Sequence, residues 1–262
     1  MLKFFRKIRR SLLNENQFPK PASPAGRYLL YAVGEIFLVV IGILIALQIN
    51  NWNEQNQTYQ RQQNYLVLIR AEMENNLEAL NTEQEKLKNV ITGFRNLLAL
   101  SDQVTDQVSE NDLSAAWSTS FSNTMKFKYD NATLTELIAS GVLKEIKNDS
   151  IRNSLNSWEG LIQKGTAQEK EVNTYLQKGN DYLEQRGSVR NIIDHNGGNR
   201  WWGIEPLSTP QSNKFLLDSP MFENVLVFGI GTGKTLNQSR YNLVEKEMEW
   251  LIQKINQELD DR

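Results

Sequence analysis

The segment whose residue types and spacing come closest to a known chemical motif is Gly229-Ile230-Gly231-Thr232-Gly233-Lys234-Thr235. Phosphate-binding P-loops carry GxxxxGK[ST], in which backbone N–H groups at a helix N-terminus surround the phosphates. Counted back from Gly233 and Lys234, the first glycine of that motif should be residue 228, which is Phe. A P-loop-like nucleotide site is therefore the least favoured interpretation. We expect instead a helix whose glycines permit close packing, or a glycine break between two helical segments.

A second group of residues combines polar and aromatic side chains within a long irregular stretch, residues 187–219. The residues that could bind a ligand or a partner are His195, Arg200, Trp201 and Trp202. Paired Trp side chains beside Arg are typical of binding hot spots. The alternative, which we favour, is a cap over the end of a helical domain with both Trp rings buried, because aromatic side chains usually fill cores.

The composition narrows the chemistry further. The chain of 262 residues has no Cys and one His, so disulfides, thiolate metal sites and a His-based catalytic triad are not expected. A net charge of -2 gives no overall attraction to nucleic acid. We therefore predict no metal, no cofactor, no nucleotide or nucleic-acid partner, and no enzymatic activity. The many Asp and Glu residues are expected on solvated helix faces.

One apolar stretch stands apart from the rest of the chain. Tyr28–Ile49 reads YLLYAVGEIFLVVIGILIALQI, and residues 36–47 carry no polar side chain. At the α-helical rise the stretch is ~33 Å long, which matches the hydrocarbon core of a bilayer. A cleaved signal peptide would have a shorter apolar run and a small-residue cleavage site. We therefore predict an uncleaved transmembrane helix over residues 28–50 and a bilayer as its partner.

Charge sets the expected orientation of this helix. Seven basic residues precede it against a single Glu15, whereas only Arg61 follows it closely. Basic flanks stay on the cytoplasmic side. We predict a cytoplasmic basic segment over residues 1–27 and an extracytoplasmic, periplasmic domain over residues 51–262. Residues 1–13 could form a basic amphipathic helix on an anionic leaflet or remain a short unstructured tail.

The predicted membrane helix also carries a stripe that could bind another helix. Glu35, Gly42 and Ala46 share one face, and Gly42 and Ala46 form a small-xxx-small pair that allows close helix approach. An acidic residue in a membrane span usually has a partner or a function. The alternative is that Glu35 lies near enough to the interface to snorkel or to be protonated. A homodimer or a partner helix could occupy this stripe.

The remainder of the chain predicts an all-α domain. Apolar residues at helical spacing indicate a long helix from about Trp52 to Leu100, a second over residues 151–183, and a third after Ser219-Pro220. Gly160, Gly165 and Gly179 allow a kink in the second helix. The predicted fold class is one N-terminal transmembrane helix followed by an antiparallel helical bundle with long helices, with coiled-coil packing as the less favoured arrangement.

Three blocks carry a family resemblance. The first joins FFRKIRR to YLLYAVGEIFLVVIGILIALQINNWNE, the second is TLTELIASGVLKEIKNDSIRNSLNSW, and the third runs from FENVL to INQEL. These blocks resemble a bacterial family of single-pass membrane proteins that is known only as a domain of unknown function. The resemblance implies a protein of the gram-negative inner membrane and cell envelope. It implies no catalytic residues, because the family has none assigned.

Two functional hypotheses follow. The first is a non-enzymatic envelope protein that binds a partner or scaffolds a complex. The second is a periplasmic sensor of a small ligand that acts through a partner, because about 27 cytoplasmic residues are too few for an output domain. A pocket among residues 187–202 would favour the sensor, and an exposed apolar stripe along the long helices would favour the scaffold.

Overall fold

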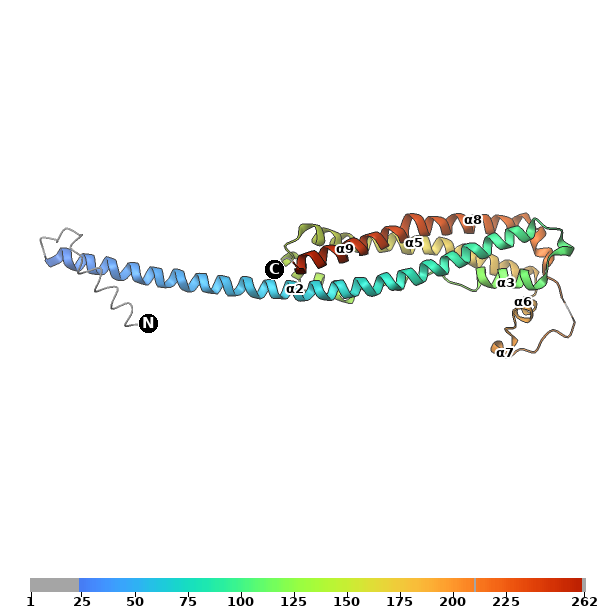
Figure 1. The fold of residues 1–262 in the computed structure, drawn as a ribbon, viewed down its shortest axis with the longest axis horizontal. Coiled ribbons are helices and arrows are strands. Elements are labelled where there is room, and N and C mark those ends of the chain that lie inside the picture. The colour runs from blue at the N-terminus through green and yellow to red at the C-terminus, as the bar shows by residue number, and fades with distance from the viewer. Residues whose placement is uncertain (1–23, 210, 261–262) are drawn as a thin grey trace. The chain divides into compact units, whose positions relative to one another are not determined.

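A computed structural model describes residues 24–209 and 211–260, and every regular element in these ranges is helical (Figure 1). The all-α prediction is thereby confirmed for the described residues. The predicted amphipathic helix over residues 1–13, and all of the basic segment up to residue 23, lie outside the described ranges. The elements are α2 (Pro24–Ser101), η1 (Thr105–Gln107), α3 (Glu110–Phe121), α4 (Ala132–Ala139), η2 (Val142–Glu145), α5 (Asp149–Arg186), α6 (Val189–His195), α7 (Asn199–Trp202), η3 (Lys214–Asp218), α8 (Pro220–Leu236), η4 (Asn237–Tyr241) and α9 (Asn242–Asp260).

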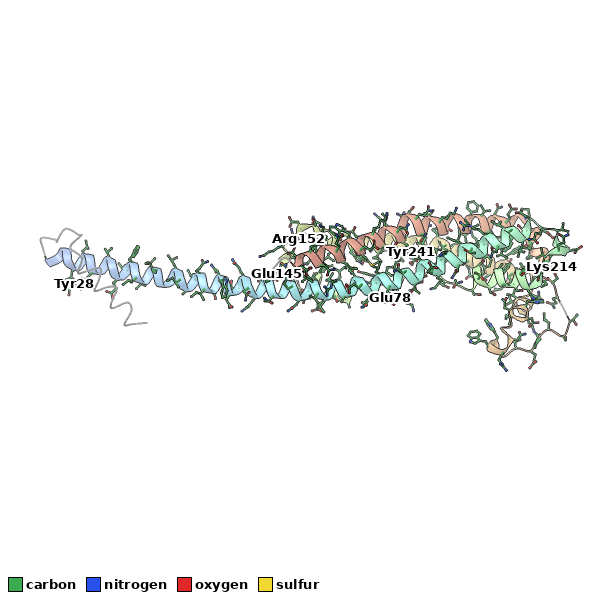
Figure 2. The ribbon with its side chains drawn as sticks, viewed as in Figure 1. Tyr28, Glu78, Glu145, Arg152, Lys214 and Tyr241 are labelled. Carbon is green, nitrogen blue, oxygen red and sulfur yellow. The ribbon has the colours of Figure 1, made fainter. Side chains whose placement is uncertain are left out.

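The chain divides into two compact units within α2, Met1–Gln60 and Arg61–Arg262. In the first unit, α2 is long and apolar enough to cross a membrane, and the side chains of its most apolar window are not buried. Figure 2 marks Tyr28 near the start of this part of α2, where the side chain is exposed, as are the apolar side chains from Ile36 to Ile49. The first unit therefore has the length and composition of a membrane span.

The second unit is built around one apolar core. On α2 the fully buried side chains recur at helical spacing, from Leu66 and Ile69 through Leu80 and Leu87 to Phe94. This stripe meets buried residues of α5, such as Trp158, and of α8 and α9. Burial of such a stripe is what stabilises helices of this length, since intrinsic propensity contributes little.

Contacts between the long helices give their directions within this unit. From α2 to the C-terminal helices, the paired residues are Phe94 with Gly229, Gln84 with Asn242, and Arg70 with Asn256. Residues further along α2 contact residues that come earlier in α8 and α9, so α8 and α9 run antiparallel to α2. From α5, Asn148 bonds to Glu258 and Gln168 bonds to Thr232. Thus α5 also runs opposite to α8 and α9, and in the same direction as α2 (Figure 1).

Two helices that run the same way need a connection that returns along their length. The chain makes this return through residues 123–131, here called the return segment, and then through α4 and η2. The return segment meets α2 at Glu83 and Asn76, and Lys147 finally meets Gln62. The connection thus travels back along α2 before α5 begins.

Polar side chains cap the starts of two long helices. Asn148 accepts hydrogen bonds from the backbone N–H groups of Ser150 and Ile151 at the start of α5. Ser219 caps α8 in the same way, and Pro220 occupies its first turn. In both caps an Asn or Ser oxygen satisfies donors that a helix start leaves free. α5 is one helix from Asp149 to Arg186, and it continues through Gly160, Gly165 and Gly179.

The third predicted long helix contains a π-helical segment. Residues Asn237–Tyr241 form η4 between α8 and α9. A π-helical turn adds one residue to the helix and rotates everything that follows. As a result Tyr241 and Val244 are buried, at 1% and 2% exposure, whereas Leu243 is 50% exposed. A helical repeat continued through this segment without the extra residue would place Leu243 in the core.

Candidate functional site

The P-loop-like segment is helical throughout. It lies inside α8, where backbone N–H groups serve the helix and do not form a phosphate-binding loop. Two of its three glycines face α2: a Cβ added at Gly229 would lie 2.7 Å from the Phe94 ring, and one added at Gly233 would lie 3.0 Å from Ile91, whereas one added at Gly231 would meet nothing within 4 Å. Of the two interpretations that competed with the P-loop, close helix packing is the one that the structure shows.

The Trp pair lies in α7, within the segment between α5 and η3 that is here called the excursion. Trp201 is 83% exposed and Trp202 is 58% exposed, and their ring centroids are 5.4 Å apart at 78°. The favoured expectation that both rings are buried is therefore wrong. The four residues of α7 pack too little surface to cover two indole rings, so the pair faces solvent within the described structure.

The excursion is nevertheless held in place by hydrogen bonds. Asp194 accepts from the Leu207 backbone N–H at 2.7 Å, and Asn196 donates to the Ser114 carbonyl at 3.1 Å. Gly197, with φ +67°, permits the turn between α6 and α7. The exposed rings are thus presented on a positioned turn.

The other two residues of the predicted group flank the rings. His195 ends α6, and its Nδ1 lies 2.9 Å from Asn111 Oδ1 on α3. Arg200 lies in α7 beside the rings, is exposed, and its side chain makes no ion pair among the described residues. The structure therefore places His195 in a contact that fixes the excursion, and leaves Arg200, Trp201 and Trp202 free for binding.

The predicted stripe of Glu35, Gly42 and Ala46 lies on the apolar part of α2. All three residues are exposed, and a Cβ at Gly42 would meet nothing within 4 Å in the described structure. A homodimer or a partner helix on this stripe stays a prediction.

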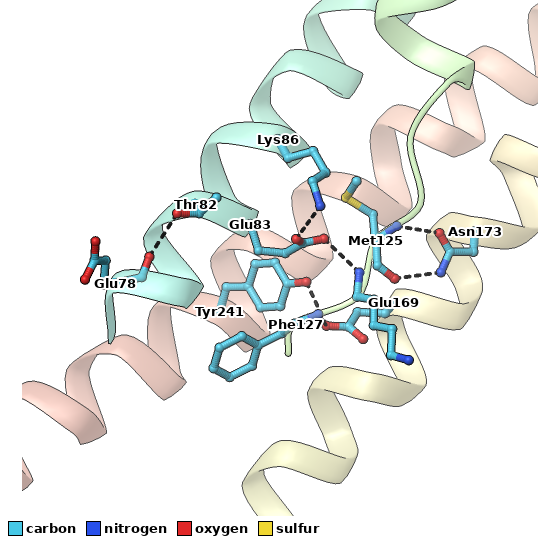
Figure 3. Close-up of polar contacts among 10 residues, drawn as sticks. Glu78, Thr82, Glu83, Lys86, Met125, Phe127, Glu169, Asn173 and Tyr241 are labelled. Carbon is cyan, nitrogen blue, oxygen red and sulfur yellow. Dashed lines mark hydrogen bonds and ion pairs between the residues drawn. The ribbon is translucent and has the colours of Figure 1, made fainter. Parts of the chain in front are cut away.

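Sequence reasoning missed a buried polar network around the return segment (Figure 3). Glu83 of α2 accepts the Lys126 backbone N–H at 2.7 Å, and Glu169 of α5 accepts that of Phe127 at 2.9 Å. The Asn173 side chain both accepts from and donates to the Met125 backbone, each at 2.8 Å. Side chains of two helices thus satisfy the backbone groups of an extended segment that no strand pairs with.

Further bonds complete this network. Lys86 neutralises Glu83 at 2.6 Å, and Asn76 pairs with both backbone groups of Asp130. Glu72 accepts the backbone N–H of Thr133 at 2.6 Å. Glu72, Glu83 and Glu169 are at most 6% exposed, so the expectation of solvated carboxylates is wrong at these positions. Their oxygens accept hydrogen bonds from the backbone of the return segment and of α4.

A signal for these residues exists in the sequence. Asn76 and Glu83 fall on the buried stripe of α2, between Met73, Leu80 and Leu87. A polar residue at an apolar position of the helical repeat indicates a buried polar contact. Its partner could not be named, because backbone groups of an irregular segment leave no pattern.

The described residues contain no group of three or more His, Asp or Glu side chains that could hold a metal ion. A groove in the described part of the chain is lined by residues of α2 and of the α8–α9 region. These features define a class: an α-helical protein with one helix able to span a membrane and a helical second unit.

Within that class, the chain belongs to the family of unknown function DUF6090, whose profile matches residues 35–182, more than half of the sequence. The predicted membership of a family of unknown function is thereby confirmed. The match runs from the apolar part of α2 to near the end of α5, and so includes Glu83 and Glu169 but not the Trp pair. No curated protein and no solved structure matches the chain.

Proposed function

We propose that this chain is a non-enzymatic, single-pass membrane protein that binds a protein partner through Trp201 and Trp202. The observation that carries the proposal is the exposure of two adjacent indole rings on a turn fixed by hydrogen bonds. Exposed large aromatics beside Arg are the residues that dominate binding energy at protein interfaces. Their rigidity reduces the entropy lost on binding.

The proposed topology keeps the N-terminus in the cytoplasm and the second unit in the periplasm of a bacterial inner membrane. The basic residues before Tyr28, and the apolar, unburied side chains that follow, support this arrangement. In the second unit we propose a helical bundle in which α8 and α9 run antiparallel to α2 and α5, as the contacts at Gln84 and Gln168 suggest. The bundle would carry the Trp turn at the end where α2 finishes.

Site-specific photo-crosslinking in the native membrane tests the proposal. We expect benzoylphenylalanine at Trp202 to crosslink one protein in a fixed ratio, and Trp201→Ala to abolish that product. The matched control is benzoylphenylalanine at Phe228, an aromatic residue on α8 that is 57% exposed against 58% for Trp202. Equal products from both positions, or none from Trp202, would contradict the proposal.

A further inference from the structure

A groove of about 390 Å³ lies in the second unit between α2 and the α8–η4–α9 region. On the α2 side it is lined by Gln84, Lys88, Ile91 and Arg95, which share one helix face. On the other side it is lined by Lys234, Asn237 and Gln238, followed by Asn242 and Glu245. Its volume is that of a small-molecule site, for which roughly 300–1,000 Å³ is usual.

The acidic residues of the groove already have partners. Glu245 accepts a hydrogen bond of 3.1 Å from Gln84, and Glu85 forms an ion pair of 3.4 Å with Lys88. By contrast, the side chains of Arg95 and Lys234 make no hydrogen bond or ion pair within the described part of the chain. Arg95 and Lys234 therefore have no acidic partner, and the charged lining as a whole, with Lys88 against Glu85 and Glu245, carries a net charge of +1.

Neutral donors lie beside these charges. The side chains of Asn237 and Gln238, at the start of η4, also have no hydrogen-bond partner among the described residues. Between the two walls lies Ile91, which is 7% exposed and packs closely against Gly233. Four side chains with free N–H donors thus line the same groove around a small apolar floor.

Asn237 and Gln238 of this wall belong to the π-helical segment η4. Segments of this kind are rare, and they occur frequently at functional sites. On its buried side η4 is fixed by Tyr241, whose hydroxyl donates to Glu169. The wall is therefore held by a bond in the core, and its geometry does not depend on a ligand.

We propose that this groove binds a small solute that carries an oxyanion, a phosphate or a carboxylate group, between Arg95 and Lys234. The guanidinium of Arg95 can bind two oxygens of such a group in parallel, and Lys234 adds a point charge from the opposite wall. Asn237 and Gln238 donate to the remaining oxygens, and a short carbon skeleton lies on Ile91. This site involves none of the residues of the Trp turn.

The experiment uses the full chain in a non-ionic maltoside detergent, with Ser239→Cys as the only cysteine. An environment-sensitive dye on this exposed position of η4 reports occupancy of the groove. Glycerol 3-phosphate and citrate are titrated as probes. We expect a saturable signal whose dissociation constant rises about ten-fold or more in Arg95→Ala/Lys234→Ala, because both charges contact the anion.

The matched control is Lys164→Ala/Lys170→Ala, which removes the same charge from an exposed part of α5. This variant should keep the dissociation constant of the unmodified groove, and both double variants should unfold at the same temperature without ligand. A parallel arm uses nanodiscs of phosphatidylcholine with or without phosphatidylglycerol. A signal confined to phosphatidylglycerol, and lost in Arg95→Ala/Lys234→Ala, identifies the anion as a lipid headgroup. Absence of a saturable signal in both arms, or equal affinity in the two double variants, overturns the proposal.

Discussion

The hydroxyl of Tyr241 donates a hydrogen bond of 2.8 Å to Glu169 Oε1, the same oxygen that accepts the backbone N–H of Phe127. One carboxylate oxygen therefore ties η4 and the return segment to α5. Tyr241 is 1% exposed and Glu169 is 4% exposed, so water does not replace either bond. Three parts of the chain that are far apart in sequence depend on this atom.

Replacing Tyr241 with Phe tests the contribution of the bond. We expect Tyr241→Phe to lower the free energy of unfolding by about 1–3 kcal/mol, because a buried acceptor loses its donor while the ring still fills its place. Urea denaturation of the full chain in detergent measures the loss. Tyr59→Phe is the control, since Tyr59 lies before the second unit begins and should leave the stability of that unit unchanged. Equal stability of Tyr241→Phe and the parent chain would contradict this account.

The same tyrosine gives the unfolding equilibrium a dependence on alkaline pH. Burial, together with the neighbouring Glu169 carboxylate, raises the pKa of Tyr241 well above its usual range. Above about pH 10 the unfolded chain loses the phenolic proton, whereas the folded chain keeps it. Stability contributed by Tyr241 is thus complete below about pH 10 and falls by about 1.4 kcal/mol per pH unit above it.

Tyr241→Phe should remove that part of the slope when unfolding is measured between about pH 9.5 and 11. Tyr129, whose pKa burial also raises, should retain its own contribution in this variant. A slope that is the same with and without the hydroxyl would show that Tyr241 ionises as readily in the folded chain as in the unfolded one.

Two glycines of α5 should respond to alanine in opposite directions. A Cβ at Gly179 would lie 1.9 Å from Cε1 of Phe121, so Gly179→Ala should destabilise by about 1–3 kcal/mol through overpacking. A Cβ at Gly160 would meet nothing within 4 Å, and Gly160→Ala should stabilise by up to about 1 kcal/mol, the difference in helix propensity. Urea denaturation of both variants distinguishes a packing contact from intrinsic propensity, and shifts of the same sign would refute the contact.

One buried and one exposed Trp should differ in how much their replacement by Ala lowers the stability of the fold. Trp158 is 1% exposed, and Trp158→Ala should cost about 3–5 kcal/mol by leaving a cavity. Trp201 is 83% exposed, and Trp201→Ala should change stability by less than about 0.5 kcal/mol. Thermal unfolding of both variants gives the comparison. A large loss of stability in Trp201→Ala would mean that the ring is a structural element and not a free binding surface.

The proposed orientation has a direct chemical test, because the parent chain has no Cys. In intact cells an impermeant maleimide should label Asn56→Cys and leave Asn14→Cys unlabelled until the membrane is opened. The two positions flank the apolar stretch on its two sides and serve as controls for each other. Labelling of Asn14→Cys alone in intact cells would reverse the proposed topology.

Helices could be predicted wherever local chemistry decides them. Asn148 and Ser219 mark helix starts because their side chains bond to the next turn, and such bonds are encoded within four residues. For the glycines near Lys234, close packing, one of the two expected alternatives, is found at Gly229 and Gly233. In each case the information lies in neighbouring residues, so the pattern and the structure agree.

Prediction failed where the structure depends on distant parts of the chain. An uninterrupted helical repeat places Leu243 in the core, because it omits the extra residue of η4. The expectation that the Trp rings are buried fails because aromatic side chains are buried only on average. That average does not determine the exposure of two rings on one short turn. Glu83 and Glu169 were placed in solvent because their partners are backbone groups about 42 residues away, beyond any local period.

The return segment also sets an order of events during synthesis. The ribosome delivers Met125 and Phe127 before Asn173 and Glu169, which follow 48 and 42 residues later. Until α5 has emerged, the nascent chain has only the α2 partners for this stretch, and Lys126 and Lys128 are open to proteases in a backbone that nothing encloses from the other side. Once α5 is complete, Asn173 and Glu169 bind the return segment from the second side. The Tyr241 hydroxyl, which is synthesised later, then adds its hydrogen bond to Glu169.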